Sequence, residues 1–235
     1  MDSSEAEPEP TPAAAGVELV PFDESRWPPA AAVLLFMILN IAMRIWLPRE
    51  SIIAAPWLLP ALEASFLGVL VFGDPAALAR QRRFLHPTAV TLATLMVLAA
   101  LWATVRLIVD LIQGSAVTND PARLLATGAL VWLGNNLSFS LLYWLIDGGG
   151  PSMRARHRLL ADFAFTQHLS PELAPHGWRP VFLDYLHLGF TNATAFSPTD
   201  VMPLTHRAKY AMLIQSTIAL ALFGLVVARA VNTFT

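Results

Sequence analysis

A stripe of polar side chains runs along a short helix predicted near the C-terminal end of the sequence. Asp184, His187, Thr191 and Thr194 are spaced i, i+3, i+7 and i+10, which places them on one side of a helix over residues 181–196. Carboxylate, imidazole and hydroxyl groups between apolar segments are typical of ion and proton pathways. The opposite side is aromatic and aliphatic, so we expect the stripe to face protein or a water-filled cavity.

A loop with several side-chain oxygens follows the stripe. The hydroxyls of the helix end and of this loop, together with one carboxylate, are the groups with which a chain of this kind would line a path for a monovalent cation. The candidate pore-loop residues are Thr191, Asn192, Thr194, Ala195, Phe196, Ser197, Pro198, Thr199 and Asp200.

Charged residues also occur inside long apolar segments: Arg44, Glu63, Arg106 and Asp110. Arg106 and Asp110 are spaced i,i+4 and are expected to pair on one helix face, while Glu63 is expected to meet an arginine of another helix. A structural ion pair is the favoured interpretation, and an ion pathway or voltage-responsive element is the other. Asn135 and Asn136 are predicted to be interhelical hydrogen-bond partners.

The motifs of several enzyme classes are missing. The chain has no cysteine, and its six histidines fall into no metal-ligand spacing. A membrane-embedded enzyme built on Asp184, His187, Asp200 and His206 is therefore a weak alternative. We predict no enzyme, no cofactor, no metal site and no nucleic-acid partner.

The composition indicates a multi-pass protein of the cell membrane, with the lipid bilayer as its main partner. Of 235 residues, 55% are hydrophobic and only 14% are charged, against about a quarter charged in soluble domains. An all-α membrane protein with about five transmembrane helices and one short re-entrant segment is predicted. The predicted spans cover residues 29–47, 52–72, 88–112, 122–146 and 210–228.

Three regions follow from this pattern. Residues 1–28 are acidic and proline-rich and predict a disordered tail. Residues 29–112 form a three-helix membrane region. Residues 122–235 form a second membrane region, in which a helix over 181–196 would be about 24 Å long at 1.5 Å per residue, shorter than the bilayer core of about 30 Å.

The second region resembles the pore module of bacterial tetrameric potassium channels. The residues Leu188-Gly-Phe-Thr-Asn-Ala-Thr are similar to the end of their pore helix, and Asp200-Val-Met-Pro-Leu-Thr205 is similar to the Asp-x-x-Pro-x-Thr that follows their filter. The resemblance implies an outer helix over 122–146, a loop over 147–180, a degenerate filter over 197–200 and an inner helix over 209–231. It also implies a homo-tetramer. The phrase from Phe190 to Asp200 resembles a family of actinobacterial integral membrane proteins as well.

The filter itself departs from that family. Ser197 and Thr199 replace the two glycines, and Pro198 replaces the tyrosine between them. Without glycine the loop lacks the dihedral freedom that rings of inward-facing carbonyls require. Potassium selectivity is not predicted. The open alternatives are a conducting protein of other selectivity and a non-conducting structural or regulatory membrane protein.

The arginines predict which side of the membrane each loop occupies. The loops after the second and fourth predicted spans are arginine-rich, with Arg80, Arg82 and Arg83 in one and Arg154 and Arg158 in the other. The positive-inside rule places both in the cytoplasm together with the N-terminus. A pore loop of the potassium-channel type enters from the outside, so the arginines and the resemblance predict opposite orientations.

Overall fold

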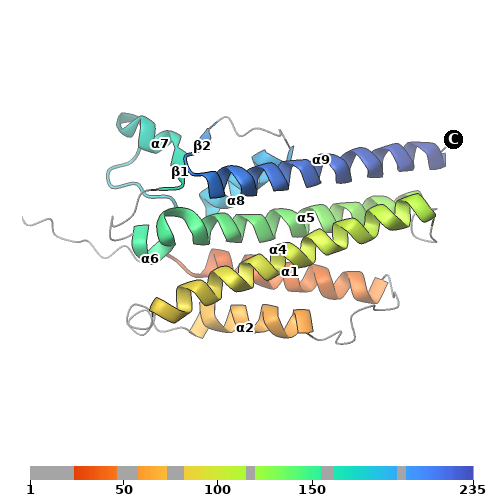
Figure 1. Ribbon diagram of the computed structural model, residues 1–235, viewed down its shortest axis with the longest axis horizontal. Helices are drawn as coiled ribbons and strands as arrows, with labels where there is room; N and C mark the ends of the chain where they lie inside the picture. The colour runs from red at the N-terminus through yellow and green to blue at the C-terminus, as the bar shows by residue number, and fades with distance from the viewer. Residues whose placement is uncertain are drawn as a thin grey trace, which may run out of the picture.

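The structure is a computed structural model that describes residues 24–46, 58–72, 82–114, 120–154, 161–194 and 200–234. Its long helices lie side by side in one elongated bundle, with the short elements gathered at one end (Figure 1). We call that end the loop end. The long helices are α1 (Trp27–Trp46), α2 (Leu58–Phe72), α4 (Arg82–Gln113), α5 (Pro121–Ile146) and α9 (His206–Phe234). The loop end holds η1 (Asp147–Gly149), α6 (Pro151–Arg154), β1 (Phe163–Phe165), α7 (Thr166–Leu169), η2 (Pro171–Leu173) and β2 (Val201–Pro203).

The described chain is mostly helical, as predicted, and four of its helices are long and apolar enough to cross a membrane. These stretches are Trp27–Arg44, His86–Gln113, Pro121–Gly149 and His206–Arg229. They correspond to the first, third, fourth and fifth predicted spans. The second predicted span contains α2, of which 15 residues are helical.

Two predicted boundaries are wrong. The helix α4 begins at Arg82 rather than at residue 88, because the chain continues the helix through Pro87 at the cost of one backbone hydrogen bond. The helix α1 begins at Trp27, inside the predicted acidic tail, and Glu24 is packed against the bundle. Residues 1–23 lie outside the described part of the chain.

The helix α5 has clear start and stop signals. The side chain of Asp120 accepts hydrogen bonds from the backbone N–H groups of Ala122 and Arg123, and Pro121 occupies the first turn. After Ile146, three consecutive glycines have φ values of 55°, 77° and 89°. Only glycine adopts such values at low cost, so the chain turns sharply here and leaves the helix axis.

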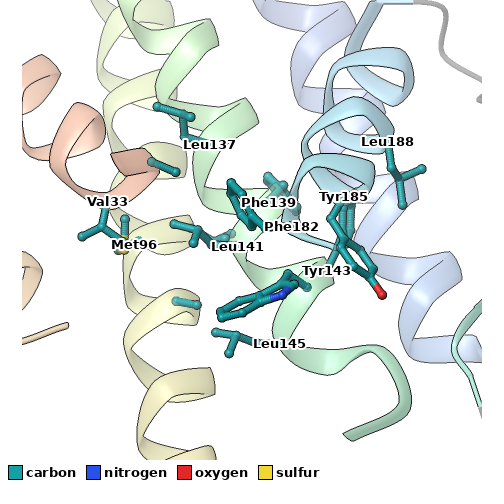
Figure 2. Close-up of a cluster of buried hydrophobic side chains, with 14 of the residues drawn as sticks. Val33, Met96, Leu137, Phe139, Leu141, Tyr143, Leu145, Phe182, Tyr185 and Leu188 are labelled. Carbon is teal, nitrogen blue, oxygen red and sulfur yellow. The ribbon is translucent and has the colours of Figure 1, made fainter. Parts of the chain in front are cut away.

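The same helix is the centre of the bundle. Within an apolar stretch of 18 residues in each candidate span, 67% of the residues are buried in α5, against 33%, 33% and 28% in the other three. It packs against α1, α4, α9 and the short helix α8 (Phe182–Thr194). Figure 2 shows Phe139 and Tyr143 of α5 directed toward Phe182 and Tyr185 of α8, while Leu141 lies near Val33 and Met96.

The helix α8 begins at the loop end, where Phe182 packs against Trp144 near the end of α5. Its last turns lie farther along the bundle, where Phe190 packs against Trp132. The strand β2, which follows α8, pairs antiparallel with β1, so that Val201 is opposite Phe165. The N–H of Thr166 donates to the carbonyl oxygen of Asp200 at 3.1 Å. The predicted helix over 181–196 is thus present as Phe182–Thr194, with residues 195–199 outside the described part.

Candidate functional site

A groove of about 630 Å³ opens on the outer face of α8, beside β1 and β2. Its lining combines acidic, imidazole and apolar groups. The lining residues are Phe165, Gln167, Leu183, Asp184, Leu186, His187, Phe190, Asp200 and Val201. Two members of the predicted polar stripe therefore face this groove, together with the carboxylate that ends the predicted filter.

His187 and Asp200 meet across the groove. The imidazole Nε2 of His187 lies 3.1 Å from Oδ2 of Asp200, and these side chains are 60% and 41% exposed. Asp184 has a different task, since its Oδ2 accepts from the backbone N–H of Val181 at 2.7 Å and caps the start of α8. The His187–Asp200 pair is thus the ionisable part of the site that water reaches.

The hydroxyl members of the stripe continue along α8 beyond the groove. Thr191 donates to the carbonyl of His187, and Thr194 donates to the carbonyl of Phe190. Their oxygen lone pairs remain available as acceptors. Thr194 is exposed, so no described residue of the same chain covers this end of the stripe. The cover that the sequence predicts is thus not supplied by the described residues.

The inner face of α8 is held by a buried polar network. The hydroxyl of Tyr143 donates to Oε1 of Gln215 at 2.6 Å, and Nδ2 of Asn192 donates to the same oxygen at 2.8 Å. Asn192 also donates to the carbonyl of Met212, and Nε2 of Gln215 donates to the carbonyl of Gly189. The network ties α8 to both α5 and α9.

This network places Asn192 differently from the other described pore-loop residues, Thr191, Thr194 and Asp200. Asn192 is 2% exposed and points into the bundle rather than toward the groove. The sequence analysis did not single out Tyr143 as a polar partner or Gln215 at all. The available signal was the one glutamine in an otherwise apolar stretch of α9, although its partners cannot be identified from spacing.

The axes of α8 and α5 approach closely at Gly189. A Cβ atom built there would lie 2.2 Å from Oγ of Ser140 and 3.4 Å from the carbonyl oxygen of Asn136. Real Cβ atoms do not come so close, so the absence of a side chain at Gly189 sets the distance between the two helices.

A buried ion pair joins the loop end to α9. The carboxylate of Asp162 is fully buried and accepts from Nε and Nη2 of Arg207, each at 2.5 Å. It also accepts from Thr205 and from the N–H of Gly148. Burial alone would raise the pKa of Asp162, but these hydrogen bonds outweigh it and hold the pKa below its usual value.

A second carboxylate of the loop end, Asp147, connects the loop to α8. Its Oδ1 accepts from the N–H groups of Asp162 and Phe163, and its Oδ2 accepts from the hydroxyl of Tyr185 at 2.5 Å. Asp147 directly follows the predicted span over 122–146, and neither Asp147 nor Asp162 is a predicted site residue. The pattern contained no signal for either role, because their partners are distant in sequence.

Glu24 fastens the start of α1 to the start of α8. Its Oε1 accepts from Nε1 of Trp144 at 2.9 Å and from the N–H of Phe182 at 2.8 Å. Its Oε2 lies 3.9 Å from Nη2 of Arg154, whose guanidinium covers the ring of Tyr185. Burial raises the pKa of Glu24, although the Arg154 charge and both hydrogen bonds act in the opposite direction.

The other predicted residues have mixed outcomes. Asn135 donates to Oγ1 of Thr104 on α4 at 2.8 Å and is interhelical as predicted. The prediction of an interhelical hydrogen bond is wrong for Asn136, because its Nδ2 donates to the carbonyl of Trp132 on the same helix. Glu63 is buried against α1, within electrostatic reach of Arg44.

The described contacts do not test the remaining predictions. Arg106 and Asp110 are half-buried on α4, and their pairing stays a prediction. Five of the predicted pore-loop residues lie outside the described part of the chain: Ala195, Phe196, Ser197, Pro198 and Thr199.

Comparison of the chain with protein-family models, with curated proteins and with solved structures found no match.

Proposed function

We propose that this chain is a multi-pass protein of the cell membrane in which α5, α8 and α9 form a pore-like module, with α8 as a re-entrant helix. The observation that carries the proposal is that the start of α8 and the strand β2, which follows α8 in the sequence, both lie at the loop end. At 13 residues, α8 is about 20 Å long at 1.5 Å per residue. That is less than the bilayer core of about 30 Å.

An ion path would run along the outer face of α8 and between copies of the chain. Toward the end opposite the loop end, the space between α4, α5 and α9 is filled by apolar side chains: Leu107, Leu111, Leu124, Val131, Leu222 and Val226. This packing leaves no polar route among the described residues of one bundle. The exposed stripe of α8 would therefore line a path only in an oligomer, for which four copies is the number that the resemblance implies.

The permeant species that suits this surface is a monovalent cation. Asp200 supplies a carboxylate at the groove, and Thr191 and Thr194 supply acceptor oxygens further along α8. The loop lacks the glycines of a potassium filter, so selectivity would come from side-chain oxygens and would be modest.

The orientation of the chain in the membrane is inferred from the distribution of its arginines. Arg154 lies at the loop end, and the arginine-rich start of α4 lies at the same end in Figure 1. The positive-inside rule places this end in the cytoplasm. The helix α8 would then enter from the cytoplasmic side, opposite to the entry of a potassium-channel pore loop.

Ion flux in liposomes containing the purified chain tests conduction. We expect flux of monovalent cations, with Asp200→Asn changing the ratio of cation to anion flux because it removes the carboxylate. Asp120→Asn is the matched control: it removes an exposed carboxylate at the other end and keeps a good N-cap. Equal selectivity in the two variants would remove the role of Asp200, and absence of flux would remove conduction.

A non-conducting structural or regulatory subunit is the second candidate. It is favoured by the apolar share of the groove, in which Leu183, Leu186 and Phe190 lie beside the polar groups. Aromatic and aliphatic residues rimmed by polar groups are typical of contact surfaces between proteins. A chain that is monomeric in detergent and gives no flux would support this candidate.

A further inference from the structure

Glu63 is a buried carboxylate that the proposed pore module does not use. It lies on α2 and is 0% exposed, packed against α1 on the side of the bundle away from α8. An ionised carboxylate removed from water is costly unless its oxygens are satisfied and its charge is balanced. The contacts of Glu63 therefore decide which form it takes.

Only one of the two carboxylate oxygens has a hydrogen-bond partner among the described residues. Oε1 accepts from Nδ2 of Asn40 at 3.1 Å, while Oε2 is buried and has none. The Asn40 amide also donates to the carbonyl of Phe36, so its orientation is fixed by α1 itself. Asn40 lies within the candidate span Trp27–Arg44, which puts the Glu63 carboxyl at the level of that span.

The charges around Glu63 balance it only weakly. From α1, Arg44 attracts the carboxylate electrostatically, but its side chain is exposed. From α4, the residues that share the core cluster of Phe66 are apolar, Met96 and Ala100 among them. In the described part of the chain, Arg44 is the one charged group that acts on Glu63.

We propose that Glu63 and Asn40 form a proton-binding site inside the membrane, between α1 and α2 and independent of the α8 module. The carboxyl takes up a proton because burial penalises its charge more than one amide and one exposed arginine stabilise it. The ligand of this site is the proton. The site does not depend on the pore-like module formed by α5, α8 and α9.

An apolar carbodiimide tests this site in the full-length chain. Dicyclohexylcarbodiimide reacts with protonated carboxyls in apolar surroundings: the carboxyl proton moves to a carbodiimide nitrogen, the carboxylate oxygen bonds to the central carbon, and the adduct rearranges to a stable N-acylurea. Peptide mass spectrometry of the chain in liposomes should find this adduct on Glu63 at mildly acidic pH and several-fold less at alkaline pH. It should be absent in Glu63→Gln.

Two arginine variants separate proton binding from mere burial. Arg44→Gln removes the attraction that favours the ionised form, so labelling of Glu63 should persist to higher pH than in the unaltered chain. Arg123→Gln, at an exposed arginine of α5, should leave the profile unchanged. Labelling that is absent at acidic pH, that does not depend on pH, or that responds equally to both variants would overturn the proposal. None of these results depends on whether the chain conducts ions.

Discussion

At the scale of single residues, two carboxylates of the loop end, Asp162 and Glu24, respond to pH in opposite directions. Asp162 accepts four hydrogen bonds, two of them from Arg207, and its pKa is lowered. Glu24 accepts two hydrogen bonds, both from the neutral N–H groups of Trp144 and Phe182, and burial raises its pKa. The first is therefore stabilising when ionised, and the second is tolerated best when neutral.

Replacing Asp162 by Asn should destabilise the chain. The variant loses the ion pair and one acceptor oxygen, which we expect to cost about 1–3 kcal/mol, less than a fully buried pair because the Arg207 side chain is 58% exposed. Denaturation in detergent measures this cost. In the unaltered chain the contribution of Asp162 is complete above the ordinary pKa of 3.8 and is lost as the pH falls through the lower folded value. The variant should lack this acid-dependent loss, and an unchanged acid profile would contradict the assignment.

Glu24→Gln should retain the fastening of α1 to α8, whereas Glu24→Ala should not. The Gln variant keeps an acceptor for Trp144 and Phe182 and removes the buried charge, so its stability at neutral pH should equal or exceed that of the unaltered chain. Because the folded pKa of Glu24 is raised, protonation favours the folded state, and stability should rise as the pH falls through that value. The Ala variant loses both acceptor contacts, at about 1–2 kcal/mol. Thermal denaturation of both variants between neutral and acidic pH makes the comparison.

At the scale of elements, α8 has two faces with different tasks. The inner face is fixed by Gly189 and by the Asn192–Gln215 bonds, while the outer face leaves His187 and Thr194 exposed. A helix of 13 residues gains little from its own backbone bonds. Its position therefore depends on the close packing against α5.

Gly189→Ala should separate α8 from α5 and destabilise the chain by about 1–3 kcal/mol, as overpacking does. Removing the clashing oxygen with Ser140→Ala should restore most of that loss, because the remaining contact with the Ser140 Cβ is 3.5 Å. A double-mutant cycle of unfolding free energies measures the coupling. Gly224→Ala, where an added Cβ meets nothing within 4 Å, is the control and should be neutral or slightly stabilising. Additive effects at Gly189 and Ser140 would contradict the packing.

At the scale of the whole molecule, the bundle has two distinct ends. The loop end gathers the β1–β2 pair, the buried carboxylates and the start of α9, while the opposite end is closed by apolar packing (Figure 1). If the four candidate spans cross a bilayer, these ends lie on opposite sides of it.

Single cysteines report this arrangement directly, because the natural chain has none. Glu172→Cys lies at the loop end in an exposed turn, and Arg123→Cys lies at the opposite end with 63% of the arginine side chain exposed. A membrane-impermeant maleimide should label the first from the cytoplasmic side and the second from the other side. Labelling of both from one side would exclude the spanning arrangement.

The sequence by itself determined the mostly helical character, the long apolar helices, the position of α8 and the periodicity of its polar stripe. These features follow from local quantities: the length of apolar runs, the 3.6-residue period and the capping signals at Asp120 and the triple glycine. The start of α4 ahead of Pro87 was not predicted, because a proline favours a helix start without requiring one. The start of α1 at Trp27 was not predicted either, because an acidic segment gives no sign that one of its carboxylates will be buried.

Only the tertiary structure decided which polar groups meet. Asn192 was predicted on the same footing as Thr194, yet it turns inward because Gln215, 23 positions away, completes its hydrogen bonds. The Asp162–Arg207 pair spans 45 positions, and the contact of Glu24 with Phe182 spans 158. Pairing across such distances depends on how the helices pack, which no local pattern encodes, and it is what fixes α8 with one face buried and the other left open.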